Sequence, residues 1–538
     1  MINSHTILVD IPVGSGVHVK SAGTKGERYV YKYTKYYRNA EGKPRNKAVS
    51  IGKVDVGSGQ MIPNNKYYEF YKVSPQMQGS SVWDFGFAYL VRKCAEDMGL
   101  FKCLNGAFGD KAMDILVVAA YIMCKGNAMD GIDDWLERTY FEGFTKSHNS
   151  QSVSRLFDSI TENSMHDFFK SWAKVALSGG NVCYDVTSIS SYSQTMVDVE
   201  YGYNRDKDKL PQFNLGVFVD EVSKLPIYYN RYNGSLTDKT NLSYVLENAK
   251  SVGIENIKFV VDGGFISKEC IQNLEKYSQA FMIGISSSLN IADEMIKLHS
   301  LGINRYANKL EDYEIYATET MIKYYGVDGR LVLFFDPTNH AQLCNELSER
   351  IRLMAAELRK LKRFPNNTKL KRYSQYFTII KHKTDNGFDF AVDNEKIDEI
   401  RSRKGFFLIF TTDKNATHND ILYHYRAKDV AEKLFDQMKI DMQANRIRTH
   451  NETTTNGKTF VTFIALAIRT FMAEILKKYL TDNSTSLKKV FNQLENITAI
   501  SGFTKGRFTK ALSKKQKDIL AAFSAHDDIL ANVESCLR

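Results

Sequence analysis

The sequence predicts a mixed α/β protein in which a small β-rich module and a helical region precede a domain built on a mixed sheet. Three patterns predict this order. Apolar residues recur at helical spacing over 81–178. From residue 180 onward, strand-like apolar runs alternate with helical segments. Two of those runs end in aspartates, where open α/β sheets place their functional sites.

The composition is that of a globular protein and disfavours secreted and membrane classes. The chain has 538 residues, enough for three or four units at roughly 150 residues per domain. Its seven cysteines form no CxxC pair, which disfavours a disulfide framework and a cysteine-ligated zinc site. No secretion-signal pattern opens the sequence, and the best apolar run, 114–124, is about half of a membrane span. We therefore expect a cytoplasmic protein with no membrane partner.

Residues 1–56 predict a small, basic, β-rich module. Alternating runs flank a Gly-Pro turn at 41–44, which indicates a hairpin. Between 20 and 47, nine basic residues oppose two acids, and five tyrosines are interleaved with them. This pattern suits nucleic-acid contact, and it equally suits a solvated hairpin face with tyrosines under lysine stems. The Gly/Ser/Asn-rich stretch 57–80 reads as a linker.

The helical region 81–178 follows, and we expect it to bind DNA. The main domain begins with strands near 181–190, 213–220 and 225–233, then alternates helix and strand up to residue 286. Residues 287–405 are expected to form an insertion that contains strands and a long basic helix. Residues 406–470 resume the domain with a buried strand, and 471–538 form a helical C-terminal region.

The predicted insertion is strongly basic. Eleven lysines and arginines lie between 350 and 383 against one acid, Glu357, and the whole chain carries a net charge of +10. Such a run is usually a solvated helix face. Its density and single sign favour contact with phosphates.

The candidate chemistry rests on carboxylates, because Walker loops, HExxH motifs and GxSxG elbows are absent from the sequence. Asp185 and Asp262 follow apolar residues of two predicted neighbouring strands. Carboxylates so placed can share Mg²⁺, and two such ions can activate a water and stabilise a leaving oxygen.

A third carboxylate can come from the predicted helix 423–439. At about 100° per residue, Tyr425, Lys428, Glu432 and Lys439 fall within roughly 60° of one another beside an apolar face. Asp429 and Asp436 lie near the same face, so the spacing alone does not single out Glu432. A surface helix with ordinary ion pairs is the alternative interpretation.

Several segments in order resemble the DDE transposases of bacterial insertion sequences. Tyr425, Lys428, Glu432 and Lys439 keep the spacing of the Tyr-Arg-Glu-Lys signature of the insertion-sequence-four superfamily. Lys428 replaces the arginine, which keeps the charge and loses the planar fork. The resemblance extends to YDVTS at 184–188, YNGSLTDKTNL at 232–242, VVDGGF at 260–265 and GKTFVTFIALAI at 457–468.

The resemblance implies an RNase H-like catalytic domain with a long strand-rich insertion. It implies that Asp185, Asp262 and Glu432 bind two Mg²⁺ or Mn²⁺ ions, and that Tyr425, Lys428 and Lys439 contact DNA. The implied reaction nicks the transposon ends by hydrolysis and joins the freed 3′-hydroxyls to target DNA. A homodimer on paired terminal inverted repeats and a nucleoid location are also implied. A metal-dependent RNase H-like nuclease, a non-catalytic DNA-binding relic and a generic basic α/β protein remain the alternatives.

Overall fold

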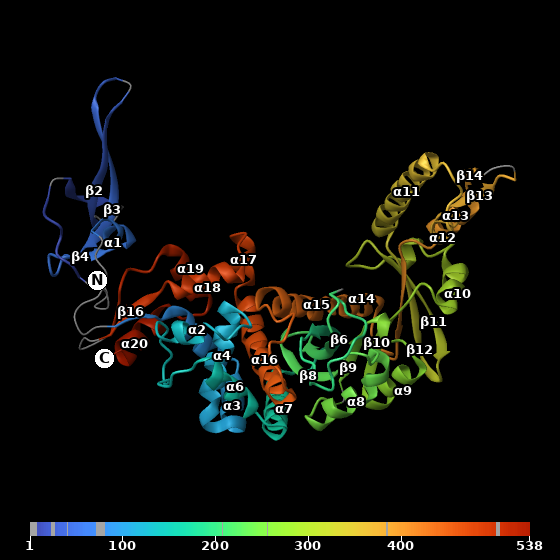
Figure 1. Cartoon of the computed structure of the whole chain (residues 1–538), viewed down its shortest axis with the longest axis horizontal. Helices are drawn as coiled ribbons and strands as arrows, with labels where there is room; N and C mark the ends of the chain where they lie inside the picture. Colours follow the sequence, from blue (N-terminus) through green and yellow to red (C-terminus); the bar gives the residue numbers. More distant parts are fainter. Residues whose placement is uncertain are drawn as a thin grey trace.

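The computed structural model describes residues 8–14, 16–22, 27–39, 41–71, 81–206, 208–255, 257–383, 386–501 and 506–537. The chain forms an elongated molecule whose parts follow one another along its length (Figure 1). The strands β1–β4 lie at one end, and a body of helices comes next. A large sheet follows, and a projection that begins with α11 forms the other end.

The large sheet has eight strands in the order β11-β12-β15-β10-β9-β6-β7-β8. Its middle strand β6 pairs in parallel with β9, and β9 pairs in parallel with β10, while every other pairing is antiparallel. The strands are β6 (Asn181–Ser190), β7 (Gln212–Asp220), β8 (Pro226–Asn233), β9 (Lys258–Val261), β10 (Ala280–Ile285), β11 (Tyr316–Tyr324), β12 (Val327–Phe335) and β15 (Phe406–Thr411).

Helices cover both faces of this sheet, and every residue of β7 is buried as a result. Figure 1 shows α14 and α15 above the strands and α8 and α9 below them. The strand segments are rich in Val, Ile, Phe and Tyr, which pack well on a pleated, buried surface. The helices next to the sheet are α8 (Asp238–Ser251), α9 (Lys268–Tyr277), α10 (Asn290–His299), α14 (His418–Ala427) and α15 (Asp429–Asp436).

The range 287–405 differs from the expected insertion, because its first two strands belong to the large sheet. β12 pairs with β15 over Arg330–Phe335 and β11 pairs with β12. The part that projects is α11 (Pro337–Lys360), α12 (Asn367–Tyr373), β13 (Phe377–Lys381), β14 (Phe388–Val392) and α13 (Asn394–Ser402). We call it the insertion projection, and it has a small hydrophobic core of its own.

The two ends of the insertion projection are bonded to each other and to α10 where they leave the sheet. The Asp336 N–H donates to the Gly405 carbonyl at 2.9 Å, and Arg403 forms an ion pair with Asp293 of α10 at 2.7 Å. His340 of α11 lies 2.9 Å from the Lys404 carbonyl through its Nδ1. The projection therefore rises from two neighbouring sheet strands that are bonded to each other at its base.

The helical body combines two regions that the sequence analysis separated, 81–178 and 471–538. The long helix α16 (Glu452–Ile475) runs through it and packs against α4 and α6, and one continuous hydrophobic cluster extends from these helices to the sheet. A three-stranded sheet in the order β17-β16-β5 joins the two regions, so strands occur in the C-terminal region that was expected to be helical. The other elements are β5 (Val82–Asp84), α2 (Gly86–Asp97), α3 (Leu100–Phe108), α4 (Ala112–Lys125), α5 (Ile132–Leu136), α6 (Ser150–Asp158), α7 (Glu162–Ala176), α17 (Lys477–Asp482), α18 (Leu487–Glu495), β16 (Thr498–Ile500), β17 (Arg507–Phe508), α19 (Lys514–Ala522) and α20 (His526–Cys536).

The N-terminal module is a four-stranded sheet with one helix. It contains β1 (Val17–Ala22), β2 (Glu27–Arg38), β3 (Pro44–Val54), β4 (Met61–Pro63) and α1 (Asn65–Tyr71). The predicted β2–β3 hairpin is therefore confirmed. The predicted linker 57–80 differs from the structure, because β4 pairs with β3 and buries all three of its residues. Residues 72–80 lie outside the described residues.

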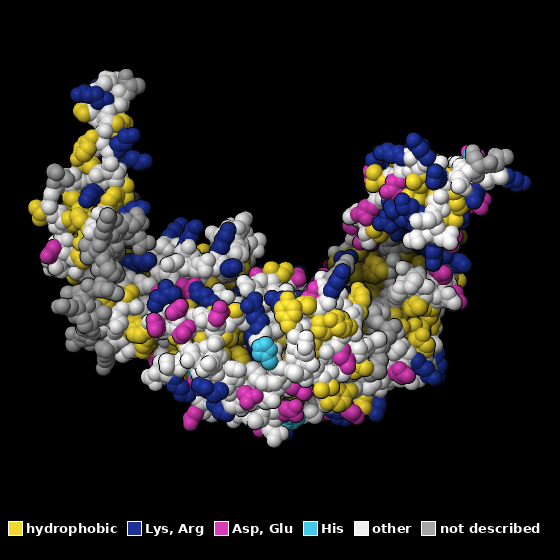
Figure 2. All heavy atoms as spheres, viewed as in Figure 1, with side chains coloured by type: hydrophobic (Ala, Val, Ile, Leu, Met, Phe, Trp, Pro, Cys, Tyr) yellow, Lys and Arg dark blue, Asp and Glu magenta, His cyan; other side chains and the backbone are white. Residues whose placement is uncertain are grey.

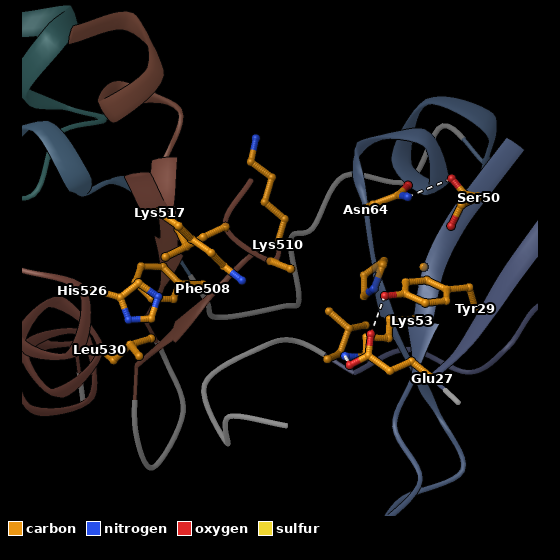
Figure 3. Close-up of a pocket in the computed structure, with 15 residues that line it drawn as sticks. Glu27, Tyr29, Ser50, Lys53, Asn64, Phe508, Lys510, Lys517, His526 and Leu530 are labelled. Carbon is orange, nitrogen blue, oxygen red and sulfur yellow. Dashed lines mark hydrogen bonds and ion pairs between the residues drawn. The ribbon is translucent and has the colours of Figure 1, made fainter. Parts of the chain in front are cut away.

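A groove of about 500 Å³ separates the N-terminal module from the C-terminal helices (Figure 3). On the module side, Glu27 accepts hydrogen bonds from the Tyr29 hydroxyl at 2.7 Å and from Lys53 at 2.6 Å. Lys510 and Lys517 line the opposite side. Among the described residues, no helix has both the length and the hydrophobicity needed to cross a membrane.

The contact between α16 and α6 predicts a steric test of the helical body. A Cβ added at Gly457 would lie 2.0 Å from the Phe157 carbonyl oxygen, and backbone cannot move aside cheaply. We expect Gly457→Ala to lower the free energy of unfolding by roughly 1–3 kcal/mol. Gly106 of α3 has no atom within 4 Å of the same added carbon. We expect the control Gly106→Ala to be neutral or to stabilise by up to about 1 kcal/mol. Urea denaturation of both variants checks the pair, and equal effects would contradict the α6–α16 contact.

Candidate functional site

The two predicted aspartates lie side by side on neighbouring parallel strands. Asp185 is in the middle of β6, and Asp262 follows the last residue of β9. The register pairs Tyr184 with Val261, so each aspartate comes one residue after that pair. Parallel pairing of β6 with β9 is thus what brings together two side chains that are 77 positions apart in the sequence.

Glu432 on α15 is the third carboxylate near Asp185. The pKa of Asp185 is raised to about 6, mainly by burial and in smaller part by the negative charges of Asp262 and Glu432. The Val186 N–H, which donates to Asp185 at 2.8 Å, and the charge of Arg205 act in the opposite direction. The charge of Glu432 acts on Asp185 and on Lys428, which favours Glu432 as the third acid over its helix neighbours Asp429 and Asp436.

Lys428 is the direct counter-ion of the second acid. Its Nζ lies 2.5 Å from Asp262 Oδ1. Burial alone would raise the pKa of Asp262, but the hydrogen bond and charge of Lys428, with the amides of Gly263 and Gly264, hold that pKa below its usual value. Burial also opposes the charge on Lys428, yet Tyr425, Asp262 and Glu432 together raise the pKa of this lysine. The site is therefore a network of charges that depend on one another.

Tyr425 joins this network from α14. The Lys428 Nζ lies 5.0 Å from the centre of its ring. Burial raises the pKa of the Tyr425 hydroxyl, and Asp262 adds to that effect against the charge of Lys428. The hydroxyl fits against β10 only because residue 284 is glycine, since a Cβ there would lie 2.0 Å from it. A glycine inside a buried strand was the sequence feature that could have indicated this close approach.

The helix predicted over 423–439 is not continuous. α14 ends at Ala427, α15 begins at Asp429, and a π-helical turn, Gln437–Asp441, follows. The segment contains no Gly or Pro, so nothing in its composition indicated these breaks. Lys439 lies in the π-helical turn, beyond the regular part of the helix. It forms an ion pair with Asp206 at 2.7 Å.

The loop between β6 and β7, residues 191–211, holds functional candidates that the sequence analysis missed. Arg205 acts electrostatically on Asp185, and Asp206 binds Lys439. Tyr201 and Tyr203 leave 75% and 80% of their surface exposed beside them. The segment YGYNRDKD, with aromatic and charged residues at close spacing, was the available sequence feature.

A buried anchor fixes α14 against the start of the sheet. His424 Nδ1 lies 2.7 Å from Glu221 Oε1, and Asn181 donates to the other oxygen of Glu221 at 2.7 Å. Asn181 is the first residue of β6, so this contact joins the helix that carries Tyr425 to the strand that carries Asp185.

The donor set suits a hard divalent cation. Carboxylate oxygens are the ligands that Mg²⁺ and Mn²⁺ prefer, and mutual repulsion among the three acids is what a cation would relieve. Among the described residues, no group of three or more His, Cys, Asp or Glu side chains is already arranged to hold a metal ion. Lys428 supplies the positive charge next to Asp262 instead.

The raised pKa of Asp185 predicts a pH-dependent effect on stability. Because the folded state binds this proton more tightly than the unfolded chain does, stability falls as the pH rises from 3.8 to above about 6. The loss is on the order of 3 kcal/mol at most. We expect metal-free Asp185→Asn to melt at a higher temperature than the wild type at pH 8, with the difference shrinking toward pH 4. Asp110→Asn, on an exposed turn, serves as the control. An equal melting temperature for Asp185→Asn and wild type at pH 8 would contradict the burial argument.

Comparisons with known proteins give one family match. The family model described as "Transposase DDE domain" matches residues 179–468. A search of curated proteins finds no match. A cryo-EM structure of the piggyBac transposase synaptic complex with hairpin DNA is 12% identical, covers 84% of this chain and 75% of its own, and has a TM-score of 0.34, too low to establish a shared fold. The family model covers more than half of the chain and includes Asp185, Asp262 and Glu432, and the protein therefore belongs to the transposase DDE domain family.

Proposed function

We propose that the protein is an active DNA transposase that cleaves the ends of its own insertion sequence and joins them to target DNA. The observation that supports the proposal is that Asp185 and Asp262 lie on neighbouring parallel strands, and that the negative charges of Asp262 and Glu432 both act on Asp185. Members of the family cleave and transfer phosphodiester bonds and generally use divalent metal ions. We also place the chain in the Tyr-Arg-Glu-Lys branch, on the spacing of Tyr425, Lys428, Glu432 and Lys439.

We infer an RNase H-like core from the strand order. The five strands β8-β7-β6-β9-β10 follow the chain order 3-2-1-4-5, and only β7 runs opposite to the others. Asp185 lies on the first of these strands and Asp262 directly after the fourth. The helix that carries Glu432 contacts β6 and β7. This arrangement supports assigning 180–286 and 406–470 to one catalytic domain that also includes β11 and β12.

Asp185, Asp262 and Glu432 would hold two Mg²⁺ or Mn²⁺ ions. When bound, such ions activate a water or a 3′-hydroxyl as nucleophile and stabilise the leaving oxygen. The carboxylates would hold such ions only as anions, so Asp185 would have to be deprotonated in the metal-bound state. Partial burial of Asp185 and Asp262 strengthens the charge interactions between them, whereas Glu432 is exposed to solvent.

Lys428 has two partners in this scheme. In the free protein it neutralises Asp262. If Asp262 held a cation, Lys428 would be free to pair with a DNA phosphate, and the Tyr425 ring next to its ammonium would restrict its position. Lys439 and Arg205 add positive charge on the side of the β6–β7 loop, where Tyr201 and Tyr203 can stack on unpaired bases.

DNA would lie along the concave side of the molecule. Figure 2 shows lysine and arginine side chains on the β2–β3 hairpin, along the floor of the concave side and on the insertion projection. Charges of one sign spread over such a surface attract the phosphate backbone without reading its sequence. Pairing of the two transposon ends by a homodimer would place two such surfaces together.

The decisive experiment is a strand-cleavage assay. The full chain is incubated with Mg²⁺ and the DNA that flanks its own gene, beside Glu432→Gln. Nicks at fixed positions in the flanking repeats, lost in the variant, support the transposase. Scattered cleavage indicates a general RNase H-like nuclease, and tight binding without cleavage in Mg²⁺ or Mn²⁺ indicates a DNA-binding relic.

The three acids predict a matched set of variants. We expect Asp185→Asn, Asp262→Asn and Glu432→Gln each to reduce strand cleavage by at least about a hundredfold, because each removes a ligand charge. Binding of end DNA should change little. Asp436→Asn removes a carboxylate from the same helix and should cleave normally. Near-normal cleavage by any of the first three variants would remove that residue from the site.

Lys439 gives a separate prediction about DNA contact. We expect Lys439→Ala to weaken end binding or cleavage by roughly tenfold, because one charge-assisted phosphate contact contributes about 1.5–3 kcal/mol. Its melting temperature should stay close to that of the wild type, since the ion pair with Asp206 is partly exposed. Lys433→Ala, on the exposed side of α15, is the control. Equal affinity and cleavage for Lys439→Ala and wild type would return this lysine to an ordinary surface role.

A further inference from the structure

A second polar cavity lies away from the three acids, where two helices begin. It has a volume of about 350 Å³. Its lining includes Ser150 and Ser154 of α6, Asn451 and Lys458 of α16, and Arg448 and His450 of the segment that leads into α16. Asp130 is the one acid in this lining, and it is exposed.

The most unusual group in this cavity is Lys458. It is 2% exposed, and within the described part of the chain its ammonium has no hydrogen-bond acceptor and no ion-pair partner. The pKa of Lys458 is lowered to about 7, mainly by burial and in smaller part by the nearby charge of Arg448. Burying most of a lysine side chain without a partner for its charge is costly, and the Lys458 ammonium is therefore a group that a ligand in the cavity could pair with.

The groups around Lys458 are of kinds that bind anions. The N-terminus of α6 and the N-terminus of α16 both face the cavity, and helix N-termini carry partial positive charge. Asn149 caps the first helix through the Ser152 N–H at 2.9 Å, and Asn451 caps the second through the Thr454 N–H at 2.8 Å. These caps use one N–H of each first turn, so other N–H groups of the same turns can serve a ligand.

The cavity is joined to the catalytic sheet by backbone contacts. The Ser190 N–H donates to the Asn445 carbonyl at 3.1 Å, and the Ile447 N–H donates to the Ser190 carbonyl at 3.0 Å. The His450 carbonyl accepts hydrogen bonds from the hydroxyls of Ser193 and Thr195. Ser190 ends the strand of Asp185, five residues or roughly 17 Å farther along it.

We propose that this cavity binds a backbone phosphate of the DNA, through Lys458, Arg448 and the first turns of α6 and α16. The proposal rests on the transposase function and extends it to a contact remote from the scissile phosphate. A phosphate here would neutralise two cations that otherwise repel each other.

The test measures DNA binding by the full chain in EDTA, so that cleavage does not contribute. Fluorescence anisotropy with the DNA that flanks the gene is repeated at several salt concentrations. Lys458→Met keeps the length and apolar stem of the side chain and removes the charge. We expect affinity to fall about tenfold and the slope of log K against log salt to become shallower by about 1. The melting temperature of the free variant should stay the same or rise.

Two further variants keep the test decisive. Arg448→Ala removes an exposed side chain, so it tests the cavity even where Lys458→Met fails to fold, and we expect a similar loss of affinity. Arg155→Ala, exposed on α6 outside the cavity, is the control and should bind DNA normally. Normal DNA affinity and salt slope in both cavity variants would overturn the proposal, whatever their melting temperatures.

An experiment with inorganic phosphate tests whether the cavity binds phosphate at all, separately from whether it binds DNA. We expect phosphate to raise the melting temperature of the wild type and to raise that of Arg448→Ala less. Stabilisation by phosphate with unchanged DNA affinity in both variants would indicate a small phosphorylated ligand and overturn the DNA assignment. None of these measurements depends on cleavage. A protein that does not cleave DNA can therefore still bind it through this cavity, and a protein that cleaves DNA can lack this contact.

Discussion

Repulsion among three carboxylates is the constraint around which this site is built. Parallel pairing of β6 with β9 puts Asp185 beside Asp262, and α15 adds Glu432. The free protein tolerates these charges in two ways. Lys428 neutralises Asp262, and Asp185 holds its proton more tightly than an exposed aspartate does. In the proposed site, a bound cation would relieve this repulsion between the carboxylates.

Many of the helices and strands could be predicted from the sequence, because they depend on residues that are close together in the chain. Apolar runs of strand length, each ending near an aspartate, predicted β6 and β9, and helical spacing predicted the segments that became α4, α7 and α11. These features depend on neighbours within a few residues, which the sequence displays directly. The neighbouring strands of Asp185 and Asp262 were predicted and are confirmed, and the role of Glu432 as the third acid stays a prediction.

What could not be predicted depends on contacts between distant residues. β12 pairs with β15 across about seventy residues, and no pattern within either strand names its partner. The breaks that flank α15 and the role of Gly284 beneath Tyr425 likewise depend on tertiary packing. The β6–β7 loop became part of the site only because Lys439 lies close enough to bind Asp206.

The base of the insertion projection has a mechanical consequence. Its two ends leave from β12 and β15, which are bonded to each other in the sheet, and the Asp336–Gly405 hydrogen bond and the Arg403–Asp293 ion pair close it there. A domain attached by one linker can rotate about it. The insertion projection is attached to the sheet at both of its ends, which restricts such rotation. The place of the projection relative to the carboxylates is therefore more restricted than that of a domain on one linker. In the proposed transposase, DNA held by the basic residues of the projection would lie at a set distance from Asp185.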